Sequence, residues 1–168
     1  MELAIDGYAI QPSKATHQQL AKATGLSETA IADTAYWLNS GSPQLLLQAF
    51  DRKAIEQVRI DYAELETICQ ADQKRTVIYL WCEEGEQIYA RFFYADNGVI
   101  LEDSGTGSAC ANLGTYFLSQ GKFPLARHIH QGDQMGRPNR LTLRLDDNQT
   151  IYVGGQVIEV GEGMFKLP

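Results

Sequence analysis

The chain has 168 residues, enough for one domain with a sizeable hydrophobic core and too few for two ordinary domains. Hydrophobic residues make up 44% of the sequence and charged residues 21%, which excludes a disordered chain and indicates a soluble globular protein. The formal net charge of −7 argues against a general nucleic-acid surface, because such a surface needs a basic patch for phosphates. We therefore expect a single domain over residues 1–168 that does not bind nucleic acid.

The sequence contains no signal for export or membrane insertion. Its first twenty residues have no basic segment followed by an apolar run, so they do not predict a signal peptide. No stretch approaches the roughly 18 apolar residues of a transmembrane helix. The three cysteines, Cys69, Cys82 and Cys110, are odd in number and have no CxxC spacing, so they predict neither a disulfide framework nor a zinc site. We expect a cytoplasmic protein, away from membranes, with its cysteines mostly buried as small hydrophobic residues.

Helical and extended patterns alternate in the first part of the chain. Ser13–Ala23 predicts a helix capped by Ser13. Leu26–Trp37 fits no single pattern, and the turn cluster NSGSP follows it. Gln44–Phe50 is a short apolar run that is typical of a buried strand.

A helix and a hairpin are predicted next. Asp61–Cys69 is helical in pattern, with Asp61 as its N-cap and Glu64 at the capping-box position. Thr76–Cys82 and Gln87–Tyr94 are rich in β-branched and aromatic residues, and the short segment EEGE separates them. This arrangement predicts a β-hairpin.

The last part of the chain combines one helix with several strands. A turn and a short extended piece at Val99–Leu101 precede a helix predicted for Thr106–Ser119. Three further strands follow, at Ala126–His130, Arg140–Leu145 and Ile151–Val160. Leucines alternate with polar residues in the second of these strands, so one of its faces is expected to be buried.

The turn before the predicted helix, in the stretch EDSGTGSACANLGTYF, has two interpretations. Gly105, Thr106, Gly107 and Ser108 place small residues and hydroxyls where the first amides of a helix lack partners and the helix dipole is positive. A glycine-rich entry lets an anion approach those amides, and Asp103 suits a general acid or base. The other interpretation is structural: Asp103 is a cap, and the small residues let the helix pass through a crowded interior.

Two histidines and one arginine are weaker candidates. His128 and His130 lie two apart on a predicted strand, so both side chains can point to one face. No third ligand with suitable spacing follows them, and we expect no metal site. Arg137 has the geometry to bind a carboxylate through two nitrogens, although its segment reads better as a structural turn.

Three motifs, taken in order, resemble a known family. The EDxxTGSA turn is followed by QGxxMGRP within Ile129–Leu141 and by the strand IYVGGQVIEVGEGMF, Ile151–Phe165. Together they resemble the PhzF-like (phenazine-biosynthesis-like) isomerase family. The upstream segments LAKATGL, NSGSPQLLL and RFFYADNGVILED look like the C-terminal half of that family, so the resemblance covers nearly the whole chain.

The resemblance implies a fold and a site. The fold would be α+β, a single diaminopimelate epimerase-like lobe with a mostly antiparallel or mixed β-sheet rolled around a central helix that starts near Thr106. The site would lie in a cleft between two such lobes and use neither metal nor cofactor. Asp103 would orient a small carboxylate substrate or assist proton transfer. Ser108, with the amides around Gly107 and the neighbouring Thr106 and Gly105, would hold the carboxylate of the substrate.

The sequence departs from the family pattern in two ways. Ser104 and Gly105 stand where family members commonly have Pro-Ala, and SGTG resembles the CGTG turn of diaminopimelate epimerases with serine in place of the acid/base cysteine. A serine hydroxyl is too weakly acidic to be an equivalent unassisted base, and Cys110 lies further into the helix and is expected in the core. In addition, the glutamate motif and the GHPT-type histidine motif of the family's N-terminal lobe have no match in the chain.

Two functional hypotheses follow. In the first, the chain is an isomerase lobe that acts on a small carboxylate as a homodimer or with a partner lobe. In the second, it is a non-catalytic remnant that binds a small anion or associates with itself, because the family's catalytic glutamate has no counterpart. Both need a way to cover the apolar surface that a second lobe would otherwise bury.

Overall fold

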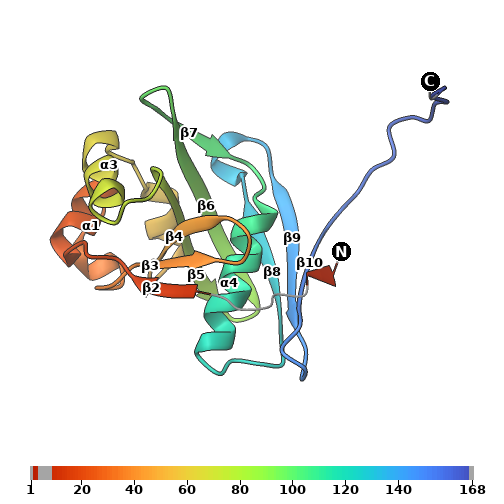
Figure 1. Cartoon of the computed structure of the whole chain (residues 1–168), viewed down its shortest axis with the longest axis horizontal. Helices are drawn as coiled ribbons and strands as arrows, with labels where there is room; N and C mark the ends of the chain where they lie inside the picture. Colours follow the sequence, from red (N-terminus) through yellow and green to blue (C-terminus); the bar gives the residue numbers. More distant parts are fainter. Residues whose placement is uncertain (1, 4–8, 167–168) are drawn as a thin grey trace.

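The computed structural model describes residues 2–3 and 9–166, and one curved sheet dominates it (Figure 1). Within these residues, ten strands form a mixed sheet in the order β1-β10-β9-β8-β6-β5-β4-β3-β2, with β7 paired to β6 off this path. The neighbours are antiparallel except for the pairs β4/β5 and β6/β8, which are parallel. The fold is α+β, as the resemblance implied.

The strands and helices have the following bounds. The strands are β1 (Glu2–Leu3), β2 (Ala9–Pro12), β3 (Tyr36–Asn39), β4 (Pro43–Gln48), β5 (Val77–Glu84), β6 (Gln87–Asp96), β7 (Val99–Asp103), β8 (Leu125–Gln131), β9 (Asn139–Leu145) and β10 (Ile151–Gly155). The helices are α1 (His17–Thr24), α2 (Arg52–Gln57), α3 (Tyr62–Ala71) and α4 (Gly107–Ser119), with short 3₁₀ turns at Glu28–Ala30 and Asp133–Met135.

The sheet is rolled around α4, which contacts strands from both of its arms, β3 and β4 on one side and β9 and β10 on the other. Small residues make this close approach feasible. A Cβ on Gly114 would lie 2.8 Å from Cγ2 of Ile151 and 3.0 Å from Cδ1 of Leu143. Ala109, Cys110, Ala111, Leu113 and Phe117 of the same helix are all buried. The expected central helix is therefore present, and its small residues have a packing role.

The other three helices lie on the opposite side of the sheet from α4. Alternate residues of β5 show this, because the ring of Trp81 packs edge-on against Phe117 of α4 while Leu80 pairs with Arg91 of β6. The guanidinium of Arg91 donates to the carbonyls of Ile55 and Val58 at the end of α2. One face of the sheet thus carries α4, and the other carries α1, α2 and α3.

Several sequence predictions are confirmed. The apolar run at 44–50 is β4, the hairpin is β5 and β6, and Asp61 caps α3 by accepting a hydrogen bond from the amide of Glu64 at 3.1 Å. Leu143 and Leu145 of β9 are buried and Arg144 between them is exposed. The three cysteines are buried, with no disulfide among them.

Three predictions at element ends are wrong. Ser13 does not cap the first helix, because Thr16 fills that position and the Ser13 hydroxyl instead donates to Asp72 at 2.6 Å. Glu64 completes no capping box: its carboxylate pairs with Lys22, and the amide of Asp61 donates to the carbonyl of Ala23.

The third error concerns the last strand, which was predicted to reach Val160. It ends at Gly155, where its pairing with Leu141 of β9 also ends. Residues 156–166 continue without regular structure and are exposed, and Figure 1 shows them leaving the body of the molecule. Beyond Gly155 the backbone pairs with no described strand, although β9 itself runs two residues further, to Asn139, so alternation of apolar residues alone does not extend the strand.

No helix in the described part of the chain combines the length and the apolar character needed to cross a membrane.

Candidate functional site

The turn between β7 and α4 brings the predicted site residues together. Asp103 is the last residue of β7, and α4 begins at Gly107. The carboxylate of Asp103 accepts a hydrogen bond from the Thr106 hydroxyl at 2.7 Å and a longer one from the amide of Gly105 at 3.4 Å. Asp103 therefore stabilises the turn locally, as the structural interpretation required. Its side chain is half-buried, and Gly107 and Ser108 beyond it are exposed.

The first amides of α4 are open. Thr106 is at the N-cap position but makes no side-chain cap, and its carbonyl accepts from the amides of Ala109 and Cys110, both at 3.1 Å. Among the hydrogen bonds of residues 2–3 and 9–166, none is donated by the amides of Gly107 or Ser108. Because α4 is 13 residues long and its dipole is positive at this end, the two amides form a place where a small anion can bind.

Access to these amides depends on Gly107. A Cβ at this position would have only Cγ1 of Val153 nearby, at 4.0 Å, so the space in front of the helix start is open. The backbone is therefore accessible from outside.

A buried network fixes the hydroxyl of Ser108. The side-chain amide of Gln44, on β4, donates to Oγ of Ser108 at 2.9 Å, and its oxygen accepts from the side chain of Asn112 at 2.7 Å. Gln44 is 1% exposed and Asn112 is fully buried. Since Oγ of Ser108 accepts from Gln44, its own proton is available for an acceptor outside the network.

Asn112 also joins α4 to the turn between β3 and β4. Its side-chain oxygen accepts from the amide of Ser40 at 2.8 Å and from the hydroxyl of Ser40 at 2.6 Å, and its NH₂ group donates to the carbonyl of Ser42 at 2.9 Å. Sequence reasoning missed Gln44 and Asn112. The available signal was an asparagine four residues after Ser108 in an apolar helix, which places both side chains on one face.

The QGxxMGRP segment packs against the 103–106 turn and stabilises it. The side chain of Gln131 donates to the carbonyl of Asp103 at 2.8 Å and accepts from the amide of Thr106 at 3.2 Å, and it is 1% exposed. Gly132 has a φ of 81°, and a Cβ there would lie 2.3 Å from the carbonyl oxygen of Arg137 and 2.8 Å from that of Ser104. Only glycine fits between these two backbones. The segment thus holds the 103–106 turn in shape.

The other titratable candidates lie apart from the turn. Burial raises the pKa of the Cys110 thiol to about 12, so this side chain is a neutral core residue at neutral pH. Nε2 of His130 donates to the side-chain oxygen of Gln87 at 2.8 Å, and its ring packs near that of Tyr89, on the sheet face opposite α4, while His128 is exposed. No group of three or more His, Cys, Asp or Glu side chains in the described residues is arranged to hold a metal ion.

Comparison with known proteins agrees with the sequence motifs. The family model described as phenazine biosynthesis-like protein matches residues 8–163. A protein of Pasteurella multocida described as an uncharacterized isomerase is 46% identical over 150 residues, which cover 89% of this chain and 50% of that protein.

Two solved structures share the fold. A phenazine biosynthesis protein of the PhzF family from Bacillus anthracis matches with a TM-score of 0.76 at 15% identity, covering 92% of this chain and 56% of that one. A predicted epimerase from Pseudomonas aeruginosa matches with a TM-score of 0.66 at 23% identity, covering 87% of this chain and 52% of that one. This chain therefore spans about half the length of the relatives that it matches.

Proposed function

Because this chain belongs to the phenazine biosynthesis-like protein family, we propose that its 103–108 turn is one half of an isomerase site for a small carboxylate substrate. The observation that carries the proposal is the open start of α4. Two amides without partners in the described residues, at Gly107 and Ser108, lie beside a hydroxyl that Gln44 fixes. A carboxylate is the anion that this small donor set suits, with the helix dipole adding favourable charge.

In the proposed function, different residues of the turn bind the substrate carboxylate and assist the reaction. The amides of Gly107 and Ser108 and the hydroxyl of Ser108 bind the carboxylate of the substrate. Asp103, whose carboxylate accepts from the Thr106 hydroxyl and the Gly105 amide, orients the rest of the substrate or assists in proton transfer. The base that removes the proton comes from a second lobe, as the family resemblance implies, because the 103–108 turn contains no second carboxylate aimed at the same space.

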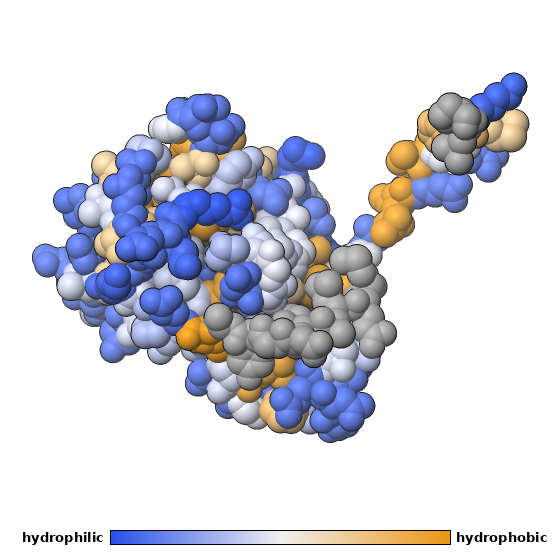
Figure 2. Space-filling model, viewed as in Figure 1, coloured by the Kyte–Doolittle hydropathy of each residue, from blue (hydrophilic) through white to orange (hydrophobic). Residues whose placement is uncertain are grey.

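The exposed C-terminal segment supports association with such a lobe. Residues 156–166 follow β10 without pairing to any described strand. The segment carries several exposed large hydrophobic side chains: Val157, Ile158, Val160, Met164 and Phe165. Figure 2 shows hydrophobic atoms in orange along the segment that leaves the body of the molecule, with hydrophilic ones in blue between them. An unpaired apolar segment of this kind is suited to join the sheet of another unit. We propose that another copy of this chain or a partner polypeptide supplies the second lobe.

Carboxylate binding can be measured without knowing the substrate. In ¹H–¹⁵N spectra of the chain titrated with sodium acetate, the amides of Gly107 and Ser108 should shift in a saturable way. Ser108→Ala should weaken binding by about tenfold, because one hydrogen bond to a charged group is lost. Ser119→Ala, at the other end of the same helix, is the matched control. Equal weakening in the two variants, or no shift at 107 and 108, would contradict the proposed site.

Catalysis needs a separate test. The chain, alone and together with the part of the Pasteurella multocida protein that it does not match, is incubated in D₂O with a panel of small carboxylates. An isomerase site would be supported if deuterium is incorporated at a substrate carbon and the rate of incorporation is at least tenfold lower in Asp103→Asn. Incorporation that is unchanged in Asp103→Asn and Ser108→Ala would exclude these residues. Anion binding without any exchange would favour the alternative, a non-catalytic anion-binding lobe.

A further inference from the structure

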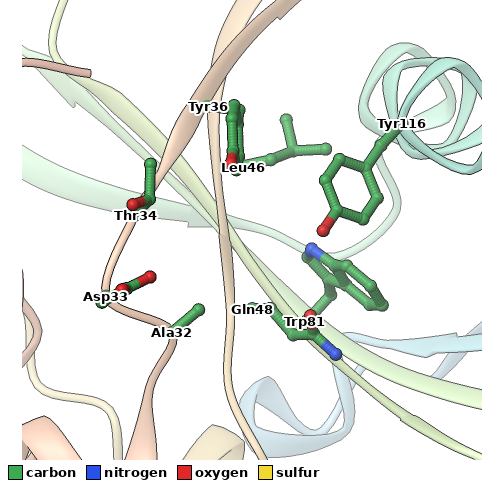
Figure 3. Close-up of a pocket in the computed structure, with 8 residues that line it drawn as sticks. All are labelled: Ala32, Asp33, Thr34, Tyr36, Leu46, Gln48, Trp81 and Tyr116. Atoms are coloured by element: carbon green, nitrogen blue, oxygen red, sulfur yellow. The ribbon is translucent and has the colours of Figure 1, made fainter. Parts of the chain in front are cut away.

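A hollow lies near the end of α4 that is remote from the 103–108 turn (Figure 3). It has a volume of about 120 Å³ and is lined by eight residues: Ala32, Asp33, Thr34, Tyr36, Leu46, Gln48, Trp81 and Tyr116. Tyr116 lies nine residues after Gly107, which corresponds to about 13 Å along the helix axis. The hollow is therefore separate from the 103–108 turn, and none of the residues proposed for that turn lines it.

Three aromatic rings from three different elements form its wall. The ring of Tyr116 on α4 lies 5.9 Å from that of Tyr36 on β3 and 5.5 Å from that of Trp81 on β5, measured between centroids. The rings are tilted to one another by 48° and 66°. Trp81 is 2% exposed and the two tyrosines are half-buried, so packing holds the wall in place.

One carboxylate faces this wall. Asp33 is the only charged residue of the eight, and Figure 3 shows it on the side of the hollow opposite Tyr116. No hydrogen bond or ion pair within residues 2–3 and 9–166 involves the carboxylate of Asp33. Burial and the neighbouring Tyr36 raise the pKa of Tyr116, so the phenol stays neutral at neutral pH and its oxygen can accept a hydrogen bond.

We propose that this pocket binds a small organic ammonium ion. A cation is attracted by aromatic rings and by a carboxylate, and the residues that line the pocket include both. An anion would meet Asp33 without any lysine, arginine or histidine among the lining residues, in a protein whose net charge is −7. The volume limits the ligand to a small ion such as a methylated or short alkyl amine. This site does not depend on the function proposed for the 103–108 turn.

The tetramethylammonium ion is the probe, with tert-butanol as a neutral molecule of similar shape. In ¹H–¹⁵N spectra at constant ionic strength, tetramethylammonium should shift the indole N–H of Trp81 in a saturable way. The indole N–H of Trp37 should not move, because it is buried and bonded to Asp72 at 2.8 Å on the other face of the sheet. tert-Butanol should shift neither signal at the same concentration.

Two variants distinguish a local charge from the overall charge. Asp33→Asn should weaken tetramethylammonium binding by about fivefold. Asp147→Asn, which removes the same charge from an exposed turn between β9 and β10, should leave binding unchanged. The proposal is overturned if tert-butanol binds as well as the cation, if the two variants weaken binding equally, or if the Trp81 signal does not respond.

Discussion

The two ends of α4 hold their side chains in place by different means. At the N-terminal end, Gln44, Asn112 and Gln131 are buried and bonded to other protein groups, and the groups left open are two backbone amides and the hydroxyl proton of Ser108. At the C-terminal end, ring packing fixes Trp81 and Tyr116, and no hydrogen bond of the described residues involves their indole N–H or hydroxyl. A site that offers backbone donors needs a side-chain network to shape it, whereas a site that offers aromatic rings and a carboxylate needs only rigid packing around it. Removing polar atoms should therefore destabilise the first end and not the second.

The largest effect is expected for Asn112→Leu. This change keeps the approximate side-chain size and raises the helix propensity, but it leaves Gln44, the Ser42 carbonyl and the Ser40 amide without their buried partner. We expect a loss of about 4 kcal/mol in the free energy of unfolding, because each buried unsatisfied group costs about 1–3 kcal/mol. Urea denaturation measures it.

Thr115→Val is the matched control in the same helix. The Thr115 hydroxyl is also buried, but it bonds only to the carbonyl of Ala111 one turn earlier, at 3.3 Å. Its loss should cost less than about 1 kcal/mol. If the two variants lose the same stability, the network does not hold the N-terminal end in the way described.

A smaller loss is expected for Gly132→Ala, which disturbs the support of the 103–106 turn. Gly132 and Gly136 both have positive φ, 81° and 67°, but only a Cβ at Gly132 would collide, with backbone atoms of Arg137 and Ser104. We expect about 3 kcal/mol for Gly132→Ala and about 1 kcal/mol for Gly136→Ala, since the second carries the conformational cost alone. The difference between the urea midpoints of the two variants is the informative quantity. Equal midpoints would show that the backbone around Gly132 shifts enough to accommodate a Cβ.

Local patterns predicted the elements that this comparison concerns. The apolar run at 44–50, the hairpin and the helix from Thr106 were found because periodicity and turn residues are local signals. The 103–108 turn was recognised from its glycines and from the family motif. Helix α2 and strand β3 were missed, since six and four residues give too short a pattern.

The partners of the polar residues could not be predicted, because they are distant in sequence. The side chain of Gln44 donates to Ser108, 64 residues further along the chain. Ser13 donates to Asp72, 59 residues away, and does not cap the first helix. The strand predicted to reach Val160 ends at Gly155, where its pairing with Leu141 of β9 ends, and Leu141 is also distant in sequence from the predicted end. The aromatic pocket gave no signal either, because Tyr36, Trp81 and Tyr116 come from three separate elements.

At the C-terminal end, Tyr116→Phe should hardly change stability at neutral pH. The hydroxyl has no protein partner in the described residues, and the ring contacts with Tyr36 and Trp81 remain. We expect a change below about 0.5 kcal/mol in the free energy of unfolding, far less than for Asn112→Leu. A loss above about 1 kcal/mol would mean that the hydroxyl is part of the structure and would remove the contrast between the two ends.

The smallest effect is a change in the alkaline pH dependence of stability. Burial, and then the neighbouring Tyr36, raise the pKa of Tyr116 in the folded protein. The unfolded chain therefore loses this proton first, near pH 10, and the contribution to stability is present below that pH and declines as the pH rises towards the folded pKa. Tyr116→Phe should lose stability less steeply above pH 10 than the parent protein, and Tyr36→Phe should lie between them because it removes only the second cause. Urea midpoints measured from pH 9 to 11 would show this order, and three parallel curves would mean that the Tyr116 hydroxyl is solvated like that of a free tyrosine.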